Sequence, residues 1–366
     1  MGAGQTSTDM TGEDEFGSIV VDTATRIFRD HCDPQTINNA VDDGWKQPLW
    51  QSLEESGLIL SWVPDDKGGA GVSIADGFEI LHVSGRFAVP VPLAETMLAG
   101  WLLAQSDIPI PAGAMTVAPC NDKDQILIDS AGRVTGTARG VPFASEASHL
   151  VVVCEQGGRT ALALIDSAVC TIADGASIAG DPRNTVEFKN VEPVAVCDLP
   201  ADFGCQDIML MGAAVRSRQM AGALTSVLDL SVEYAKERIA FERPIGKFQT
   251  IQHNLAKLAG EVAAAEAVSG SAADAINQAL LFDDAVFLET ASAKIRVGEA
   301  AGEGAAIAHQ VFGAIGFTAE HILHRLTRRL WAWRDDFGSE SEWAVQLGTR
   351  VAKDGADELW PTLAAR

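Results

Sequence analysis

Three residue types that together suit an anionic, ring-bearing ligand surround a break between two helical patterns, in the segment RIAFERPIGKFQ. Arg238 falls at the end of the first pattern and Gln249 in the opening turn of the second, because Pro244 and Gly246 prevent one continuous helix. A guanidinium group offers a planar fork of donors, and a helix start adds unpaired N–H groups, so the pair favours an anion. Phe241 would add an apolar wall for a ring. The spacing also fits an ordinary turn, with Arg238 capping carbonyls and Phe241 in the core.

The composition of the chain excludes several classes of ligand and location. The 366 residues carry a formal charge of −23, which argues against a nucleic-acid binder because phosphate affinity needs clustered Lys and Arg. The six cysteines form no C-x-x-C pair, so reduced thiols are expected. The acidic start lacks an apolar core, and no run reaches the roughly 18 apolar residues of a membrane span. The sequence predicts a cytoplasmic protein with no membrane segment.

The pattern of apolar and turn-forming residues divides the chain into three regions after a short N-terminus, and it predicts a mainly α fold with a small β-domain. Residues 1–16 are expected to be a disordered N-terminus, and 17–112 an N-terminal helical domain with apolar residues three and four apart. Residues 113–200 hold short runs such as HLVVVCE and TALALID between Gly, Asp and Asn, which predict a central β-domain. Residues 201–366 return to long Ala-rich helical patterns, which favour a four-helix bundle.

Several motifs closely resemble one known family. The segments RIAFERPIGKFQ, QHNLAKLAGE and HQVFGAIGFTAEH resemble the C-terminal signature of the acyl-CoA dehydrogenases. GLILSWVPDDKGGAGVS and FAVPVPLAETMLA extend the likeness to the first domain. The resemblance covers nearly the whole chain and implies that family's order of domains: helical, β-barrel-like, four-helix bundle.

The resemblance also implies a cofactor, FAD, and a substrate, an acyl-CoA thioester. In that family the hinge and a later Q-x-x-G turn hold the pyrophosphate and adenosine of an FAD whose ring lies mainly against a neighbouring subunit. Carried over by position, the cofactor-binding residues are Arg238, Phe241, Gln249, Gln310 and Gly313. The family commonly shows a second glycine after this turn, where this chain has Ala314.

The catalytic base of the family is missing from both of its usual places. The first is a Glu that opens an E-G-T/S motif near the C-terminus, but here Phe337 precedes Gly338 and Ser339. The second lies on the first bundle helix, where the chain reads LMGAAVRSR around Gly212. The β-domain likewise lacks the T-E-x-x-x-G-S-D and K-x-W-I-T/S segments that contact the flavin ring. No catalytic residue is therefore assigned.

One explanation covers both losses. The chain resembles the smaller, non-catalytic subunit of the heterotetrameric α2β2 acyl-CoA dehydrogenases of steroid side-chain degradation. A catalytic sister subunit would supply the base, the flavin-ring contacts and the acyl-CoA pocket, and electrons would pass to an electron-transferring flavoprotein. The acyl group and the identity of the sister chain are not encoded in these residues.

Two alternatives remain open. A self-sufficient homotetramer would need a displaced base, for which the nearby carboxylates are Asp335, Asp336, Glu340 and Glu342. A non-enzymatic interaction protein would have kept the fold and lost FAD.

Two further clusters suggest weaker hypotheses. His321 and His324 do not form a metal motif, so no metal is predicted. A cluster of three cations would grip an anionic CoA or a neighbouring subunit, or form ion pairs with the bundle. Its members are Arg325, Arg328 and Arg329.

Overall fold

The N-terminal part of the computed structural model is helical, and the structure describes residues 12–364 except 41, 107, 122, 201–202 and 280–281. The helices are α1 (Gly12–His31), α2 (Pro34–Asn39), α3 (Lys46–Glu55), α4 (Ile74–Arg86) and α5 (Leu93–Ala104), with 3-10 turns η1 (Asp43–Trp45), η2 (Leu58–Leu60) and η3 (Asp65–Lys67). Helix α1 begins inside the segment expected to be disordered, whose first eleven residues lie outside the described part. Helix α5 is buried on nearly every side, as its all-round apolar sequence requires.

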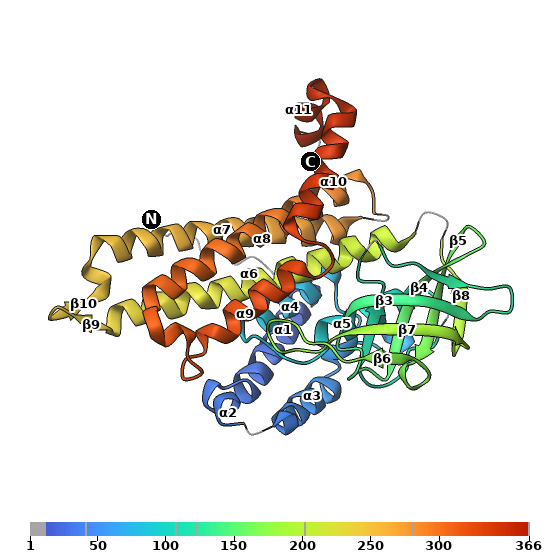
Figure 1. The fold of residues 1–366 in the computed structure, drawn as a ribbon, viewed down its shortest axis with the longest axis horizontal. Coiled ribbons are helices and arrows are strands. Elements are labelled where there is room, and N and C mark those ends of the chain that lie inside the picture. Colours follow the sequence, from blue (N-terminus) through green and yellow to red (C-terminus); the bar gives the residue numbers. More distant parts are fainter. Residues whose placement is uncertain are drawn as a thin grey trace, which may run out of the picture.

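The central domain is a β-sheet (Figure 1), whose side chains contribute to two hydrophobic cores. Its strands are β1 (Met115–Ala118), β2 (Ile126–Ile128), β3 (Val134–Pro142), β4 (His149–Gln156), β5 (Arg159–Asp166), β6 (Thr171–Ala173), β7 (Arg183–Val191) and β8 (Ala195–Asp198), with the turn η4 (Ser167–Val169). Among the described residues the order is β6-β7-β3-β2-β4-β5-β8, with β1 parallel to β4. Side chains alternate across a strand: Val151 and Val153 join the helical core, while Leu150 and Val152 face the domain's own interior.

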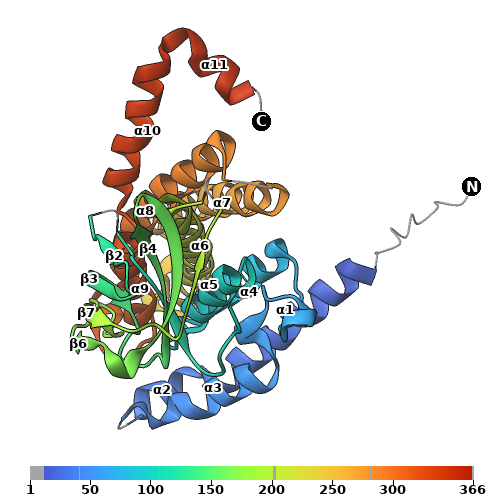
Figure 2. The same ribbon diagram turned by 90° about the vertical axis from the view of Figure 1, so that its right-hand side faces the viewer.

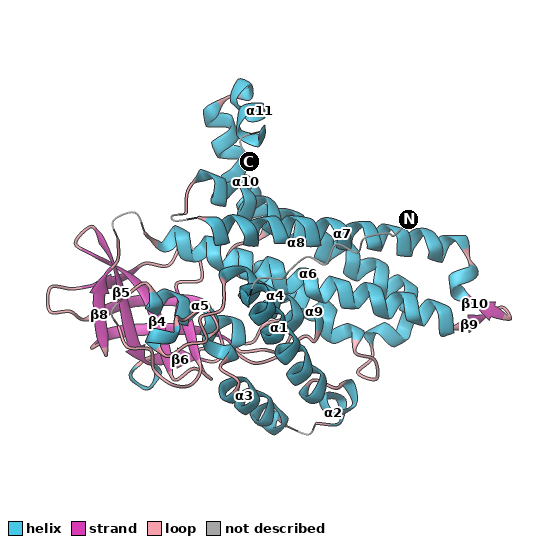
Figure 3. Cartoon of the chain, turned by 180° about the vertical axis from the view of Figure 1, so that it is seen from behind, coloured by secondary structure: helices cyan, strands magenta, loops and turns pink. Residues whose placement is uncertain are grey.

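Long helices form the C-terminal part. They are α6 (Cys205–Glu237), α7 (Gln249–Gln278), α8 (Asp284–Phe312) and α9 (Leu323–Asp335), followed by α10 (Glu340–Asp354) and α11 (Ala356–Ala364). Helices α6 and α4 cross at two glycines, because a Cβ on Gly222 would lie 1.9 Å from the His82 carbonyl oxygen and one on Gly85 1.9 Å from that of Gln219. A small hairpin of β9 (Ile239–Ala240) and β10 (Arg243–Pro244), followed by η5 (Ile245–Lys247), links α6 to α7. Figure 3 shows this hairpin at the opposite end of the bundle from the sheet.

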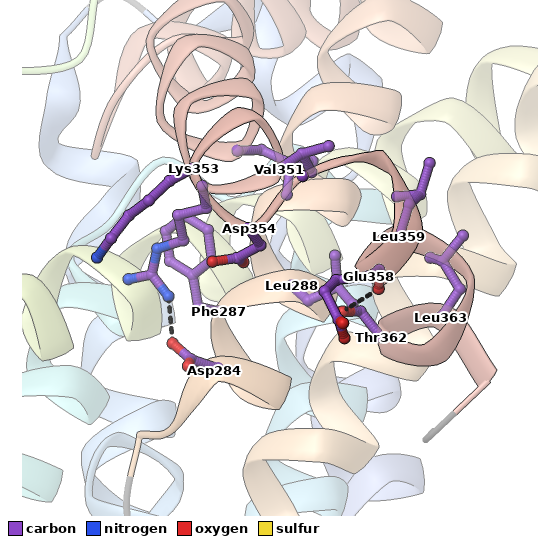
Figure 4. Close-up of a pocket in the computed structure, with 13 residues that line it drawn as sticks. Asp284, Phe287, Leu288, Val351, Lys353, Asp354, Glu358, Leu359, Thr362 and Leu363 are labelled. Atoms are coloured by element: carbon purple, nitrogen blue, oxygen red, sulfur yellow. Dashed lines mark hydrogen bonds and ion pairs between the residues drawn. The ribbon is translucent and has the colours of Figure 1, made fainter.

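Helices α10 and α11 form an arm that leaves the body of the protein (Figure 2). Between the arm and α8 lies a cavity of about 440 Å³ (Figure 4). On its wall the Arg350 guanidinium stacks 3.5 Å from the Phe287 ring centre and pairs with Asp284. The cavity contains none of the predicted cofactor-binding residues. No helix within the described ranges is long and apolar enough to cross a membrane.

Candidate functional site

The predicted hinge is a β-hairpin with two residues in each strand, and it projects from the end of the bundle (Figure 1). Helix α6 ends at Glu237, and the N–H of its C-cap residue Arg238 donates to the Tyr234 carbonyl at 2.8 Å. The turn residues Phe241 and Glu242 have φ of 51° and 65°, the paired positive values that a type I′ hairpin turn needs. The break between helices is thus where the sequence placed it, but it contains strands that the helical patterns did not predict.

The side chains of the hairpin that were predicted to bind the cofactor are exposed to solvent. Phe241 is 91% exposed, and its ring meets the edge of the Phe248 ring at 6.2 Å between ring centres. Arg238 is exposed, and Gln249 begins α7 with an exposed side chain. The expectation of a buried core phenylalanine in an ordinary turn is therefore wrong. An exposed aromatic beside an arginine and a helix N-terminus is a surface built for contact.

The second predicted pair lies at the same end of the bundle. Gln310 is exposed in the last turn of α8, and Gly313, which opens η6 (Gly313–Phe317), has φ 64° and ψ −143°. Phe312, between them, stacks on Tyr234 at 4.3 Å, and the Tyr234 hydroxyl donates to the Phe312 carbonyl at 3.4 Å. This contact ties the two predicted segments to each other one helical turn before the hairpin.

The two positions where a base was sought meet inside the protein. A Cβ on Gly212 of α6 would lie 2.3 Å from Cδ1 of the Phe337 ring, so ring and glycine are in direct contact. Phe337 is 2% exposed and has φ 53°, a strained value for a phenylalanine. The Trp343 indole N–H donates to the Phe337 carbonyl at 2.9 Å and helps to hold this backbone. An aromatic ring therefore fills the point at which both sequence positions converge.

A buried ion cluster lies beside this ring. Arg216, only 2% exposed, directs Nε to Asp336 Oδ2 at 3.1 Å, Nη1 to Gln219 Oε1 at 2.6 Å, and Nη2 to Glu95. Burial alone would lower the pKa of Arg216, but the charges of Glu95 and Asp336 outweigh it and raise that pKa. The guanidinium is therefore held charged between two carboxylates.

A buried lysine holds the end of the helix that leads into the Phe337 loop. Lys294 Nζ donates to the carbonyls of Trp333 at 2.7 Å and Arg334 at 3.0 Å, in the last turn of α9. Burial lowers the pKa of Lys294 to about 7, although Asp336 opposes the shift. These contacts satisfy carbonyls that a helix end leaves open.

Little space remains between the ion cluster and the β-domain. The cavity bounded by Arg216, Trp333 and Asp336 on one side and by Pro142 and Phe143 on the other has a volume of about 20 Å³. That is room for about one water molecule. The three fused rings of a flavin therefore do not fit in this cavity.

The four carboxylates considered as displaced bases are all engaged. Asp336 binds Arg216 and Arg183, and Asp335 and Glu340 each lie 3.6 Å from the Arg334 Nε. Glu342 accepts from the Ser339 N–H at 2.9 Å and pairs with Lys123 at 3.0 Å. The Ser339 N–H and Lys123 lower the pKa of Glu342, which makes it a weaker base.

The ion cluster was not foreseen, although the sequence carries a signal for it. Glu95 stands in the apolar run LAETMLAGWLLA, and Arg216 in the small-residue run MGAAVRSRQMAGA. A charged residue that a helix buries on all sides needs a partner. The sequence therefore predicts that Glu95 and Arg216 each have a buried partner, but it does not predict that the two residues pair with each other.

Among the described residues, no arginine of the cluster at the start of α9 forms an ion pair with a bundle helix, so that expectation is wrong. Arg329 binds Asp181 of the loop before β7 at 2.7 Å. Arg325 donates to the Ile37 carbonyl and Arg328 to the Ile178 carbonyl. Within the described residues no group of three or more potential ligands could hold a metal ion.

Comparisons with known proteins agree with this geometry. The acyl-CoA dehydrogenase C-terminal domain matches residues 207–334. The acyl-CoA dehydrogenase IpdE2 of Mycobacterium tuberculosis is 27% identical over 86% of this chain and 91% of its own length. The chain is thus similar to acyl-CoA dehydrogenases along most of its length.

Solved structures share the fold over almost the full length. A variant of the Tcur3481-Tcur3483 steroid ACAD aligns with a TM-score of 0.81 at 22% identity, over 93% of this chain and 99% of that one. A chain of the ChsE4-ChsE5 complex from Mycobacterium tuberculosis aligns with a TM-score of 0.81 at 21% identity, over 93% and 98%. The predicted layout of helical, β and helical domains is confirmed.

Proposed function

We propose that this chain is the non-catalytic subunit of a heteromeric, FAD-dependent acyl-CoA dehydrogenase that acts on a steroid side chain or another bulky acyl group. It would bind the pyrophosphate and adenosine of an FAD whose ring lies in a sister subunit. That sister subunit would supply the base and the acyl-CoA pocket and would pass electrons to an electron-transferring flavoprotein.

The filled central site is the observation that carries this proposal. Phe337 occupies the convergence point of the two base positions, and Arg216, Glu95 and Asp336 close the space behind it. A phenyl ring cannot accept a proton, and Asp336 is held by two arginines. The self-sufficient alternative would need one of these groups to leave a buried, paired position.

The distance between the two features supports a role across an interface. Arg216 and Arg238 lie on or at the end of the same helix, 22 residues apart in sequence, which is about 33 Å at 1.5 Å per residue. The central site and the hairpin therefore do not line one binding site within the chain. A cofactor gripped at the exposed Arg238 and Phe241 would have its ring on another subunit.

The steroid part of the proposal rests on the relatives. One matching structure is described as a steroid ACAD made of two named components, and another as a complex of two named proteins. The retained combination of Arg238, Phe241 and a helix start at Gln249 argues against a non-enzymatic protein that has lost FAD, since these groups suit an anionic, ring-bearing ligand.

The test is the flavin content of the complex formed with a sister acyl-CoA dehydrogenase that carries the Glu and the flavin-ring segments. Arg238→Ala should weaken FAD binding about 10- to 100-fold, because a charge-assisted hydrogen bond is worth about 1.5–3 kcal/mol. Lys236→Ala is the control, since Lys236 is a nearby exposed cation paired with Glu233 at 3.1 Å. Equal flavin retention in the two variants would refute the role of Arg238.

A further inference from the structure

A basic cavity lies where three parts of the chain meet, on the half of α9 farthest from Phe337. The α1–α3 segment, the loop between β6 and β7, and α9 enclose a volume of about 360 Å³. Its charged lining residues are the cations Lys46, Arg325, Arg328 and Arg329 and the carboxylates Asp42, Asp43 and Asp181, and Gly180 lies at its edge. The proposed function uses none of them.

Two of the cavity's cations have no neutralising partner in the part of the chain that the structure describes. Lys46 pairs with Asp43 at 2.9 Å, and Arg329 with Asp181 at 2.7 Å. Arg325, by contrast, donates through Nη2 to the Ile37 carbonyl at 3.1 Å. Nothing in the described ranges forms a salt bridge with it, and the chain as a whole is strongly acidic. A cation left without a carboxylate in such a protein is suited to bind an external anion.

Arg328 shows the same arrangement. Its Nε donates to the Ile178 carbonyl at 2.6 Å, and no described carboxylate lies within salt-bridge distance. A guanidinium carries five N–H donors, so the Nη groups of this exposed side chain are available to a ligand. The four cations of the lining and its three carboxylates, Asp42, Asp43 and Asp181, leave a net charge of about +1, and the two cations outside described ion pairs are Arg325 and Arg328.

Two of the arginines that line the cavity also have a buried donor without an acceptor. Nε of Arg329, a residue 4% exposed, and Nε of Arg325 are both buried and make no hydrogen bond to any described residue. Burial, with the nearby charges of Arg329 and Arg328, lowers the pKa of Arg325. Buried donors are costly when unpaired, and an oxyanion is the partner that guanidinium groups bind best.

The loop over the cavity leaves room at its edge. Gly180 has φ 91°, and its N–H donates to the Ser177 carbonyl at 2.9 Å, which closes a tight turn. A Cβ on Gly180 would lie 3.8 Å from Arg328 Nη2. The glycine thus allows the turn and keeps a side chain away from the guanidinium.

We propose that this cavity binds a phosphate-bearing small molecule, with Arg325 and Arg328 as the main anion contacts. A phosphomonoester or diphosphate supplies the two negative charges that match these guanidinium groups and enough oxygens for several N–H donors at once. The volume admits a diphosphate with part of an attached nucleoside. The lining of this cavity includes none of the residues proposed to bind FAD.

Isothermal titration calorimetry of the full chain with inorganic pyrophosphate and with ADP tests the proposal, in buffer whose ionic strength is fixed with chloride. We expect one site per chain for at least one probe, and at least tenfold weaker binding to Arg325→Gln/Arg328→Gln. The control is Arg133→Gln/Arg159→Gln, which removes the same charge from partly or largely exposed β-domain arginines. A preference for ADP would indicate a nucleotide, and equal affinity a bare diphosphate.

The single variant Arg328→Gln keeps the test valid if the double variant misfolds, because Arg328 is exposed. It should weaken binding severalfold while the circular dichroism spectrum and thermal midpoint stay unchanged. Absence of binding by both probes to the native chain would overturn the proposal. Binding that is equally strong in the cavity variants and the control would overturn it as well.

Discussion

Replacing Arg216 by methionine is expected to destabilise the chain by about 3–5 kcal/mol, the range found when one partner of a buried ion pair is removed. Arg216 is 2% exposed, and it is the shared partner of Glu95 and Asp336. Glu95 is itself 3% exposed and has no other ion-pair partner among the described residues. The variant would leave two carboxylates buried with much less compensation.

The expected loss is large against a total stability of about 5–15 kcal/mol. Urea unfolding followed by circular dichroism and by tryptophan fluorescence would measure it, since agreement of the two probes shows whether a single transition applies. Arg133→Met is the matched control, because Arg133 is 42% exposed in its side chain and lies 3.6 Å from Glu192. Surface pairs of this kind contribute about 1 kcal/mol or less.

A neutral triple variant separates charge from shape. Arg216→Met combined with Glu95→Gln and Asp336→Asn removes the uncompensated charges, so it should recover more than half of the loss. A loss below about 1 kcal/mol in Arg216→Met would refute the account of the buried cluster. So would a triple variant as unstable as the single one.

Three further outcomes are expected. Gly212→Ala should cost about 1–3 kcal/mol by overpacking the Phe337 ring, and Phe337→Ala in the same chain should remove most of that cost in a double-mutant cycle. Burial opposes ionisation of Glu266, but His82 and its other partners lower the pKa of Glu266 to about 2. The contribution of this carboxylate to the stability of native protein should therefore be lost as the pH falls from 4.5 to 2, and Glu266→Gln should not show this loss. The pKa of Lys294 is about 7 in the folded chain against 10.5 in the unfolded chain, so between these pH values the unfolded state binds more protons. The urea midpoint of native protein should therefore rise relative to that of Lys294→Met as the pH increases from 7 to 10.5.

The sequence predicted the order of domains and the ends of the central helices because these depend on local pattern. Pro244 and Gly246 placed the break, and Arg238 and Gln249 do stand at the end of α6 and the start of α7. The hairpin between them was not predicted, because two strands of two residues have too little periodicity to recognise. The positive φ at Phe241 also has no marker, since phenylalanine seldom adopts it.

The arrangement of the central site could not be predicted without the tertiary structure. Glu95, Arg216 and Asp336 are separated by 121 and 120 residues, so no spacing rule connects them. The sequence showed that a base was missing at Phe337 and Gly212, but not that the two positions touch. Because Phe337 and Gly212 are in contact, the two positions that lack a carboxylate form one site, which the Phe337 ring fills. This contact arises from tertiary packing and cannot be read from either motif.

The visible spectrum and native mass of the purified chain, alone and then with the proposed catalytic sister subunit, test the central claim most directly. The account predicts a colourless chain alone and a yellow α2β2 complex with two flavins. A yellow homo-oligomer that dehydrogenates acyl-CoA without a partner would contradict it, because Phe337 and the Arg216 cluster would then have to vacate the space they fill.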